Sequence, residues 1–361
     1  MSTFLKMLGL PGYVLYTLLT TSYASYNSDK SFRRIIWDSV VRYSYKGDMT
    51  QVSGTTLEVY KRWAKTTGNE ETVDEIGADA QLLWLGPKTV RGHVLLVFHG
   101  GGYMMPIPDF ALSCWRYVGQ QVAEAGVEIG VAVLHYSLAP AAKFPTQLIQ
   151  ASHALSALLA AGVPPSRIHL AGDSAGGNLV LQLLSHILHP HPAVPALSLP
   201  HPLAAAFLFS PWTTWCRGTP SWSENAALDY VPVHMIPTDS APVLEQFGIQ
   251  EEYRAFAEPG TLALDGSDAW FAGLPGTLRR VVVAAGGCEC MRDDIVRLAE
   301  VLQAQAKYLD SEGGVQLVVQ HGGLHVDMIM DFFAGDGRRG RVGSLTKMLI
   351  ERLVADGKES E

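Results

Sequence analysis

Short apolar runs alternate with longer segments of helical periodicity from about residue 78 onward. The runs have the length of strands, and the segments between them have the length of helices. The predicted strands span residues 81–85, 94–98, 130–135, 168–171, 204–209, 281–285 and 315–320, and the predicted helices span 109–125, 145–161, 174–188 and 292–309. This alternation predicts a mostly parallel central sheet with helices on both faces. Val281, Val282 and Val283 are apolar in succession, as a strand covered on both faces requires.

Two segments do not follow the alternation. One precedes the first predicted strand, and the other separates two neighbouring strands of the sheet. The predicted division of the chain is therefore an N-terminal cap segment (1–60), a first part of the core (61–211), a cap insertion (212–275) and a second part of the core (276–361). The insertion holds tryptophans at positions 212, 215, 222 and 270. These aromatic side chains fit an apolar substrate pocket and fit plain packing equally well.

Composition narrows the classes of function. The formal net charge is −8 over 361 residues, and nucleic-acid binding calls for a basic face instead. Four cysteines, at positions 114, 216, 288 and 290, are too few for a disulfide framework in a chain of this length. A reducing, cytoplasmic location is the simpler interpretation. Cys288 and Cys290 have no second ligand pair at zinc-site spacing, so we expect no metal and no cofactor.

The segment from Phe4 to Tyr16 is largely apolar, with Lys6 near its start. A membrane span needs about 20 apolar residues, and Gly9 and Pro11 interrupt this shorter stretch. The pattern favours an amphipathic cap helix. Peripheral membrane association through this segment is the alternative, and the sequence does not favour it.

Two glycine-rich motifs carry the chemistry. Gly172-Asp173-Ser174-Ala175-Gly176 has the form G-x-S-x-G, in which a serine occupies a sharp turn between a strand and a helix. His99-Gly100-Gly101-Gly102 follows an earlier strand and has the form of a loop that donates backbone N–H groups to an oxyanion. Together they indicate acyl transfer by a serine nucleophile, most simply ester hydrolysis. A helix-capping serine is the alternative interpretation of Ser174, and the flanking glycines disfavour it.

With these motifs, the chain resembles the hormone-sensitive-lipase-like group of α/β-hydrolases, which includes arylacetamide-deacetylase-like esterases. The resemblance extends to Tyr136-Ser137-Leu138-Ala139-Pro140, where the group usually has arginine at the second position, to Phe144-Pro145, and to Ser210-Pro211-Trp212. It covers roughly residues 80–335 in matching order. It implies an α/β-hydrolase fold with a helical cap and the triad order serine, acid, histidine.

The base is expected after the last strand, where His321 and His325 are the candidates. The resemblance favours His325, which lies in the loop past the strand and its glycines. The acid is expected after the strand at 281–285. Glu289-Cys290-Met291-Arg292-Asp293 matches the group's D-P-L-R-D segment, with glutamate in the catalytic place, so Glu289 is the predicted acid. Asp293 and Asp294 fit better as acidic residues in the first turn of the next helix.

The predicted oxyanion donors are the N–H groups of Gly101 and Gly102, by resemblance, and of Ala175, which follows the nucleophile at a helix N-terminus. The chain is thus expected to be a serine hydrolase that cleaves a carboxylic ester of a small apolar molecule through Ser174, His325 and Glu289. An acyltransferase, a lactonase or an amide deacetylase would use the same residues. A non-catalytic ligand receptor on this fold is disfavoured, because the serine and the histidine are both present. The sequence does not indicate an oligomeric state.

Overall fold

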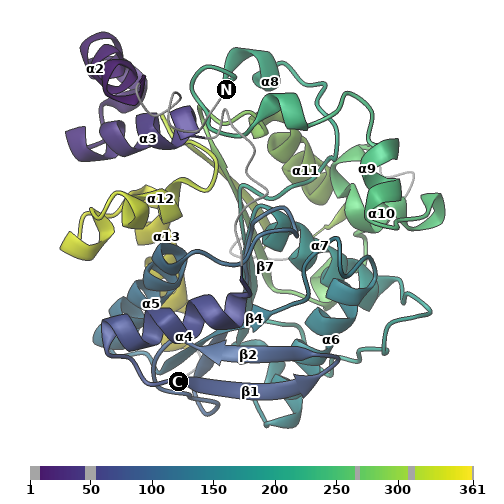
Figure 1. Ribbon diagram of the computed structural model, residues 1–361. Helices are drawn as coiled ribbons and strands as arrows, with labels where there is room; N and C mark the ends of the chain where they lie inside the picture. Colours follow the sequence, from purple (N-terminus) through teal and green to yellow (C-terminus); the bar gives the residue numbers. More distant parts are fainter. Residues whose placement is uncertain (1–8, 45–53, 265–268, 308–313, 360–361) are drawn as a thin grey trace.

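The computed structural model describes residues 9–44, 54–264, 269–307 and 314–359 (Figure 1). Within them, eight strands form one sheet in the order β1-β2-β4-β3-β5-β6-β7-β8. The strands are β1 (Thr72–Gly77), β2 (Ala80–Trp84), β3 (His93–Phe98), β4 (Ile129–His135), β5 (Ile168–Asp173), β6 (Ala205–Phe209), β7 (Arg280–Gly286) and β8 (Gly314–Gln320).

The sheet is mostly parallel. From β4 through β3 to β8, every neighbouring pair of strands is parallel. Only β2 runs against its neighbours, because it pairs antiparallel with both β1 and β4. The carboxyl ends of the parallel strands therefore open onto one edge of the sheet, where the loops after β3, β5, β6, β7 and β8 meet.

The mostly parallel sheet predicted from the apolar runs is confirmed, and each predicted strand lies within two residues of an observed one. Strand β1 was not predicted. Its sequence, Thr-Val-Asp-Glu-Ile-Gly, is polar and only half-buried, and it forms an edge strand that depends on β2. The helix predicted at 292–309 ends earlier, at Gln305, and residues 308–309 lie outside the described residues.

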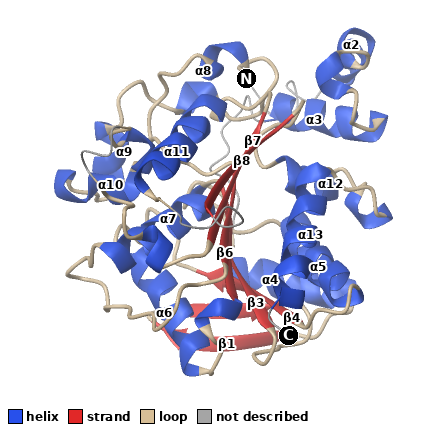
Figure 2. Ribbon diagram, turned by 180° about the vertical axis from the view of Figure 1, so that it is seen from behind, coloured by secondary structure: helices blue, strands red, loops and turns tan. Residues whose placement is uncertain are grey.

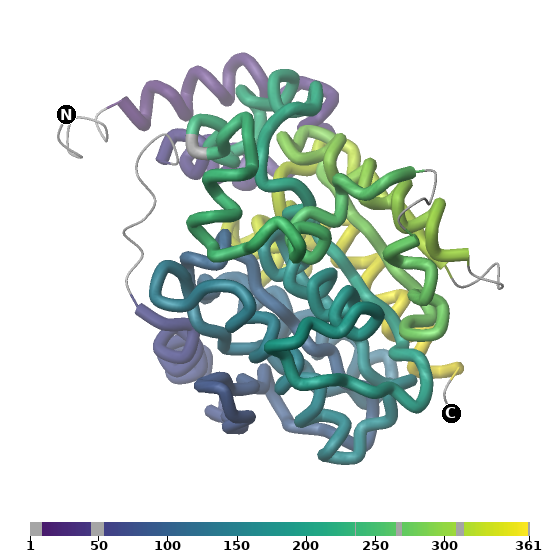
Figure 3. Tube along the Cα trace, turned by 90° about the vertical axis from the view of Figure 1, so that its right-hand side faces the viewer, coloured from purple at the N-terminus to yellow at the C-terminus, as the bar shows by residue number. Residues whose placement is uncertain are grey.

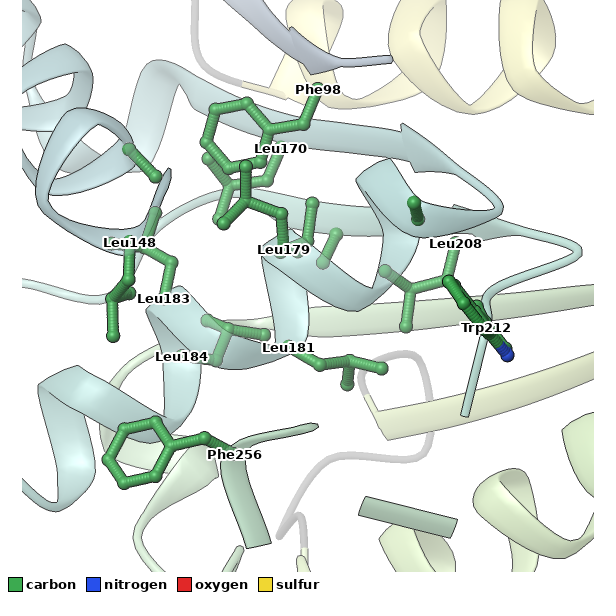
Figure 4. Packing of buried hydrophobic residues seen from close by; sticks show 14 of the residues in the cluster. Phe98, Leu148, Leu170, Leu179, Leu181, Leu183, Leu184, Leu208, Trp212 and Phe256 are labelled. Atoms are coloured by element: carbon green, nitrogen blue, oxygen red, sulfur yellow. The ribbon is translucent and has the colours of Figure 1, made fainter. Parts of the chain in front are cut away.

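Helices cover both faces of the sheet, which Figure 2 shows nearly edge-on. One face carries α6 (Thr146–Ala160), α7 (Ala175–Leu188) and α11 (Arg292–Gln305). The other carries α4 (Thr56–Thr67), α5 (Asp109–Glu124), α12 (Asp327–Phe333) and α13 (Ser344–Glu359). Each face has its own buried apolar cluster. The first cluster continues past α7 into the insertion between β6 and β7, where Phe256 and Trp212 pack around the leucines of α7 (Figure 4).

That insertion contains α8 (Ser221–Glu224), α9 (Ala241–Gln246) and α10 (Arg254–Ala257), joined by loops and single helical turns. The N-terminal helices α2 (Leu10–Thr21) and α3 (Phe32–Ser44) lie at the same end of the molecule as α8 (Figures 1 and 3). Helix α2 packs against α3 and leaves Leu15, Tyr16 and Leu19 exposed. None of the described helices combines the length and the hydropathy that a membrane crossing requires. The division into core and cap segments stays a prediction.

Helix α3 is bound to α12 by a buried arginine. Arg34 is 2% exposed, and its guanidinium forms ion pairs with Asp38, Asp327 and Asp331. Asp327 begins α12 and also accepts hydrogen bonds from the Leu324 backbone N–H (3.0 Å) and from the side chain of Gln320 (2.8 Å). The N-terminal segment thus contacts the start of α12, directly after the loop that follows β8, through a largely buried charged network.

Candidate active site

Ser174 lies on a strained turn between β5 and α7. Its φ is +51° and its ψ is −119°, a backbone conformation that non-glycine residues rarely adopt. The turn is tight enough that a Cβ on Gly176 would lie 1.9 Å from the carbonyl oxygen of Phe98 in the neighbouring strand. Only glycine fits there. The Ser174 side chain does not cap α7, so the helix-cap interpretation of this serine finds no support.

His325 and Glu289 come together with Ser174. The Nε2 atom of His325 lies 3.0 Å from Ser174 Oγ, and its Nδ1 atom lies 2.6 Å from Glu289 Oε1. His325 comes from the loop after β8, and Glu289 comes from the loop after β7. Glu289 is fully buried and His325 is 8% exposed. The structure therefore brings the three predicted triad residues into one hydrogen-bonded row from three separate loops.

The Glu289 carboxylate accepts hydrogen bonds with its second oxygen as well. Its Oε2 atom accepts hydrogen bonds from Ser210 Oγ (2.9 Å) and from the Gly286 backbone N–H (2.8 Å). Burial raises the pKa of Glu289, and the hydrogen bond and charge of His325 act in the opposite direction. For His325, burial acts to lower the pKa. The hydrogen bond and charge of Glu289, together with the charges of Asp229 and Asp173, outweigh burial and raise the pKa above its ordinary value. The carboxylate thus stabilises the protonated imidazole that forms when a serine proton is accepted.

The rejected candidates lie elsewhere. His321 is exposed at the end of β8. Asp293 accepts a hydrogen bond from the Ser221 backbone N–H (2.9 Å), and Asp294 accepts one from the Trp222 indole (2.8 Å). Both aspartates lie in the first turn of α11, as expected from the sequence. They hold the start of α8 against α11 and do not approach His325.

The glycine loop after β3 lies beside the Ser174 turn. Gly101 has φ +108°, and a Cβ there would meet the Met105 carbonyl oxygen at 2.7 Å, so this position too requires glycine. In the described part of the chain, the backbone N–H groups of Gly101, Gly102 and Ala175 donate to no protein acceptor. Donors that stay free beside a nucleophile are what an oxyanion needs.

Two ionisable residues, His99 of the glycine loop and Asp173 of the serine turn, form hydrogen bonds that hold the loop and the turn in place. His99 lies between Thr56 Oγ1 (2.9 Å from Nε2) and the Gly100 carbonyl oxygen (2.7 Å from Nδ1), and burial lowers its pKa to about 4. Asp173 accepts the Gly100 backbone N–H at 3.1 Å, and burial raises its pKa to about 7. His99 therefore stays neutral and shapes the loop, while Asp173 binds the loop to the serine turn.

Two polar residues that contact the triad were given no role there by the sequence analysis. Ser210, after β6, donates to Glu289 and accepts the Val326 backbone N–H at 3.0 Å. Asp229, from the insertion, accepts the backbone N–H groups of His325 (3.1 Å) and Cys290 (2.8 Å). The position of Ser210 directly after a predicted strand could have indicated a role at the site, because the loops after the strands meet there. Asp229 lies in an irregular segment, and no sequence pattern around it indicated such a role. Among the described residues, no group of histidine, cysteine or carboxylate side chains is arranged to hold a metal ion.

The comparisons with known proteins identify the fold family. Residues 95–326 match the model of a family described as having the alpha/beta hydrolase fold. The chain belongs to this α/β-hydrolase family. Solved structures of hormone-sensitive-lipase-like proteins share this fold. An esterase from the bacterial hormone-sensitive lipase family has a TM-score of 0.62 at 22% identity, over 90% of this chain and 99% of that one. EstE7, a hormone-sensitive lipase homologue from a metagenome library, has a TM-score of 0.64 at 20% identity, over 89% and 98%.

Curated relatives of this α/β-hydrolase include proteins named as an acetyl-hydrolase and as an esterase. An acetyl-hydrolase of Streptomyces hygroscopicus is 29% identical over 212 residues, which are 58% of this chain and 62% of the relative. Esterase LipI of Mycobacterium tuberculosis is 27% identical over 229 residues, or 60% and 62%. An arylacetamide deacetylase of Oryctolagus cuniculus is 33% identical over 107 residues, or 28% and 26%. The chain thus spans about 62% of the length of the first two relatives.

Proposed function

We propose that this α/β-hydrolase is a serine hydrolase that cleaves the carboxylic ester of a small apolar molecule. The observation that carries the proposal is the row of two hydrogen bonds from Ser174 through His325 to Glu289, 3.0 and 2.6 Å long. A serine hydroxyl is a weak nucleophile without an adjacent base, and here the base is itself oriented by a carboxylate.

In the proposed reaction, His325 Nε2 takes the proton of Ser174 as the hydroxyl oxygen attacks the ester carbonyl carbon. The carbonyl oxygen becomes an oxyanion and accepts hydrogen bonds from the N–H groups of Gly101, Gly102 and Ala175. The imidazolium then donates its proton to the leaving alcohol, and the acyl group stays on Ser174. Water, deprotonated by His325, attacks this acyl-enzyme and releases the acid. Glu289 keeps its negative charge throughout and orients the imidazole.

The preference for a small apolar substrate rests on the aromatic residues beside the serine turn. The Trp212 backbone N–H donates to the Ser174 carbonyl oxygen at 2.9 Å. The backbone of Trp212 therefore lies next to that of the nucleophile. Trp212 stacks on Trp215 with ring centroids 4.8 Å apart, and Trp215 in turn contacts Tyr103 and Phe247. All four side chains belong to the buried core, and Trp212 is the most exposed of them at 8%. Trp212 is therefore the one we expect to contact an apolar acyl or alcohol group. The names of the acetyl-hydrolase and esterase relatives point toward short acyl esters.

Substitution of Ser174 by alanine tests the proposal. With a p-nitrophenyl ester of a short acid, Ser174→Ala should lower kcat by about 10³-fold or more, because the acyl-enzyme cannot form. Ser156→Ala, at an exposed serine of α6, is the matched control and should keep full activity. A fluorophosphonate probe should label the wild-type protein and the control, and it should not label Ser174→Ala. Wild-type turnover by a folded Ser174→Ala variant would contradict the assignment.

The same assay separates the alternative activities. Added alcohols or amines should yield transacylation products if the protein is an acyltransferase. An arylacetamide substrate belongs in the screen because one relative is named as an arylacetamide deacetylase. Each of these activities would disappear with Ser174→Ala, so substrate comparison, not mutation, distinguishes them.

A further inference from the structure

A short segment of the insertion, Asn225–Tyr230, contacts both loops that carry the proposed acid and base. The Asn225 side-chain amide donates to the Glu289 carbonyl oxygen at 2.8 Å. The Tyr230 hydroxyl donates to the carbonyl oxygen of His325. Both contacts reach the backbone of a triad residue. They leave its side chain free to react.

Asp229 lies at the centre of this segment and is 2% exposed. Its Oδ1 atom accepts the backbone N–H of His325 at 3.1 Å and that of its neighbour Tyr230 at 2.9 Å. Its Oδ2 atom accepts the backbone N–H of Cys290 at 2.8 Å. The Asp229 carboxylate therefore bridges two residues, Cys290, which follows Glu289, and His325. In the described part of the chain it forms no ion pair with lysine or arginine, so these N–H groups offset its burial.

The bridge has a counterpart on the other side of the triad. Ser210, which follows β6 in the core, joins the Glu289 side chain to the Val326 backbone. The two catalytic loops also contact each other directly, because the Cys288 backbone N–H donates to the Gly323 carbonyl oxygen at 2.8 Å. Two further connections run through other parts of the chain, one through Ser210 of the sheet core and one through Asp229 of the insertion. The connection through Asp229 makes the geometry of the triad depend on the position of the insertion.

We propose that Asp229 is a positioning residue, which holds the Glu289 and His325 loops in register and places a negative charge near the imidazole. This inference rests on the proposed ester hydrolysis. Loss of the carboxylate would leave at least one buried N–H group without an acceptor, since an asparagine amide can accept at only one of its two positions. The two loops would then move relative to one another. Displacements of about 1 Å between reacting groups cost on the order of 100-fold in rate.

The charge of Asp229 gives the proposal a pH signature. The ionisable groups that act on His325 are Glu289, Asp229 and Asp173, and those that face Asp229 include Glu289, Cys288 and Cys290. Burial acts to lower the pKa of His325, whereas Glu289 and, to a smaller extent, Asp229 raise it. The base must be neutral to accept a proton, so activity is lost as the pH falls through the pKa of His325. Without the Asp229 charge, this acidic limb should move to lower pH.

The test compares Asp229→Asn with Tyr230→Phe and with Asp239→Asn, an exposed aspartate of the same insertion that serves as the matched control. Asp229→Asn should lower kcat for a p-nitrophenyl ester by roughly 10- to 100-fold at nearly constant KM, and should shift the acidic limb of kcat/KM to lower pH. Tyr230→Phe removes one hydrogen bond and no charge, so kcat should fall less and the limb should stay in place. Asp239→Asn should match the wild-type protein.

Active-site titration with a fluorophosphonate probe corrects kcat for the fraction of folded enzyme. An Asp229→Asn variant with wild-type kcat per labelled site and an unmoved acidic limb would overturn the positioning role. If Asp229→Asn does not fold, wild-type kcat in Tyr230→Phe would overturn the role of this segment. Failure of the probe to label wild-type Ser174 would instead contradict the proposed hydrolysis, so the two failures are distinguishable.

Discussion

Replacement of Arg34 by methionine should destabilise the protein by a measurable and calculable amount. The side chain is 2% exposed and pairs with Asp38, Asp327 and Asp331. Asp38 would retain Lys30 at 3.1 Å, but the other two carboxylates would lose their cation. Removing one partner of a buried ion pair costs about 3–5 kcal/mol, because the remaining charge stays buried. Methionine keeps much of the volume, so cavity formation adds little to this cost.

The expected change in Tm follows from the size of the chain. An unfolding entropy of about 2.1 cal/mol/K per residue gives about 0.76 kcal/mol/K for 361 residues. A loss of about 3–5 kcal/mol then lowers Tm by about 4–7 °C. Thermal unfolding followed by circular dichroism measures this shift, with Arg62→Met on the exposed face of α4 as the matched control.

A compensating variant tests the cause. Arg34→Met combined with Asp327→Asn and Asp331→Asn removes the unpaired charges, and asparagine at 327 can still accept the Leu324 backbone N–H. This triple variant should recover more than half of the lost Tm. The reasoning is refuted if Arg34→Met melts within about 1 °C of the wild type, or if neutralising both aspartates makes the loss larger.

Three further outcomes are expected. His325→Ala should be nearly inactive toward a p-nitrophenyl ester, because the His325 ring contacts Ser174. His321→Ala should keep most of the wild-type kcat. The opposite order of activities would mean that the base is misassigned. Glu289→Gln should lower kcat sharply by removing the charge beside the imidazolium. Asp293→Asn changes a residue that holds the start of α8 and should lower kcat much less. Equal losses of kcat in the two variants would contradict the assignment of the acid. Asp173→Asn should gain stability relative to the wild type as the pH rises. The pKa of Asp173 is raised to about 7 in the folded protein, so the folded state binds the extra proton between about 4 and 7 and wild-type stability falls across that window by at most about 4 kcal/mol. Melting curves at pH 5 and pH 8 check this, and a pH-independent difference in Tm would contradict it.

The parts of the molecule that could be predicted from sequence are those whose signals are local. Strands such as Val281–Ala285 are apolar on both faces, and the serine turn needs glycine at fixed offsets because the backbone crosses Phe98 within contact distance. For the acid and the base, the order of the strands limited the candidates to two short segments. The resemblance to the hormone-sensitive-lipase-like group then selected Glu289 and His325 within them. Strand β1 could not be predicted, because its polar residues form a strand only when β2 offers a partner edge.

Two buried charged residues, Asp229 beside the triad and Arg34 of helix α3, had no such local signal. Asp229 and Arg34 are charged residues in ordinary surface-like sequence, and their burial depends on contacts 96 and 293 residues away along the chain. Nothing in the spacing around either residue indicates those partners. Long-range hydrogen bonding of this kind is a property of the finished fold, so only the structure could show it.

The span between Arg34 and Asp327 also has a consequence for synthesis. At about 5–20 residues per second, a ribosome needs roughly 15–60 s to add the residues between them. Over that interval Arg34 has no Asp327 or Asp331 to pair with, and His325 has not yet been made. The same late stretch of translation therefore supplies the base and the anchor of helix α3. A nascent chain stalled before Asp327 would lack the anchor for α3, and one stalled before His325 would also lack the proposed base.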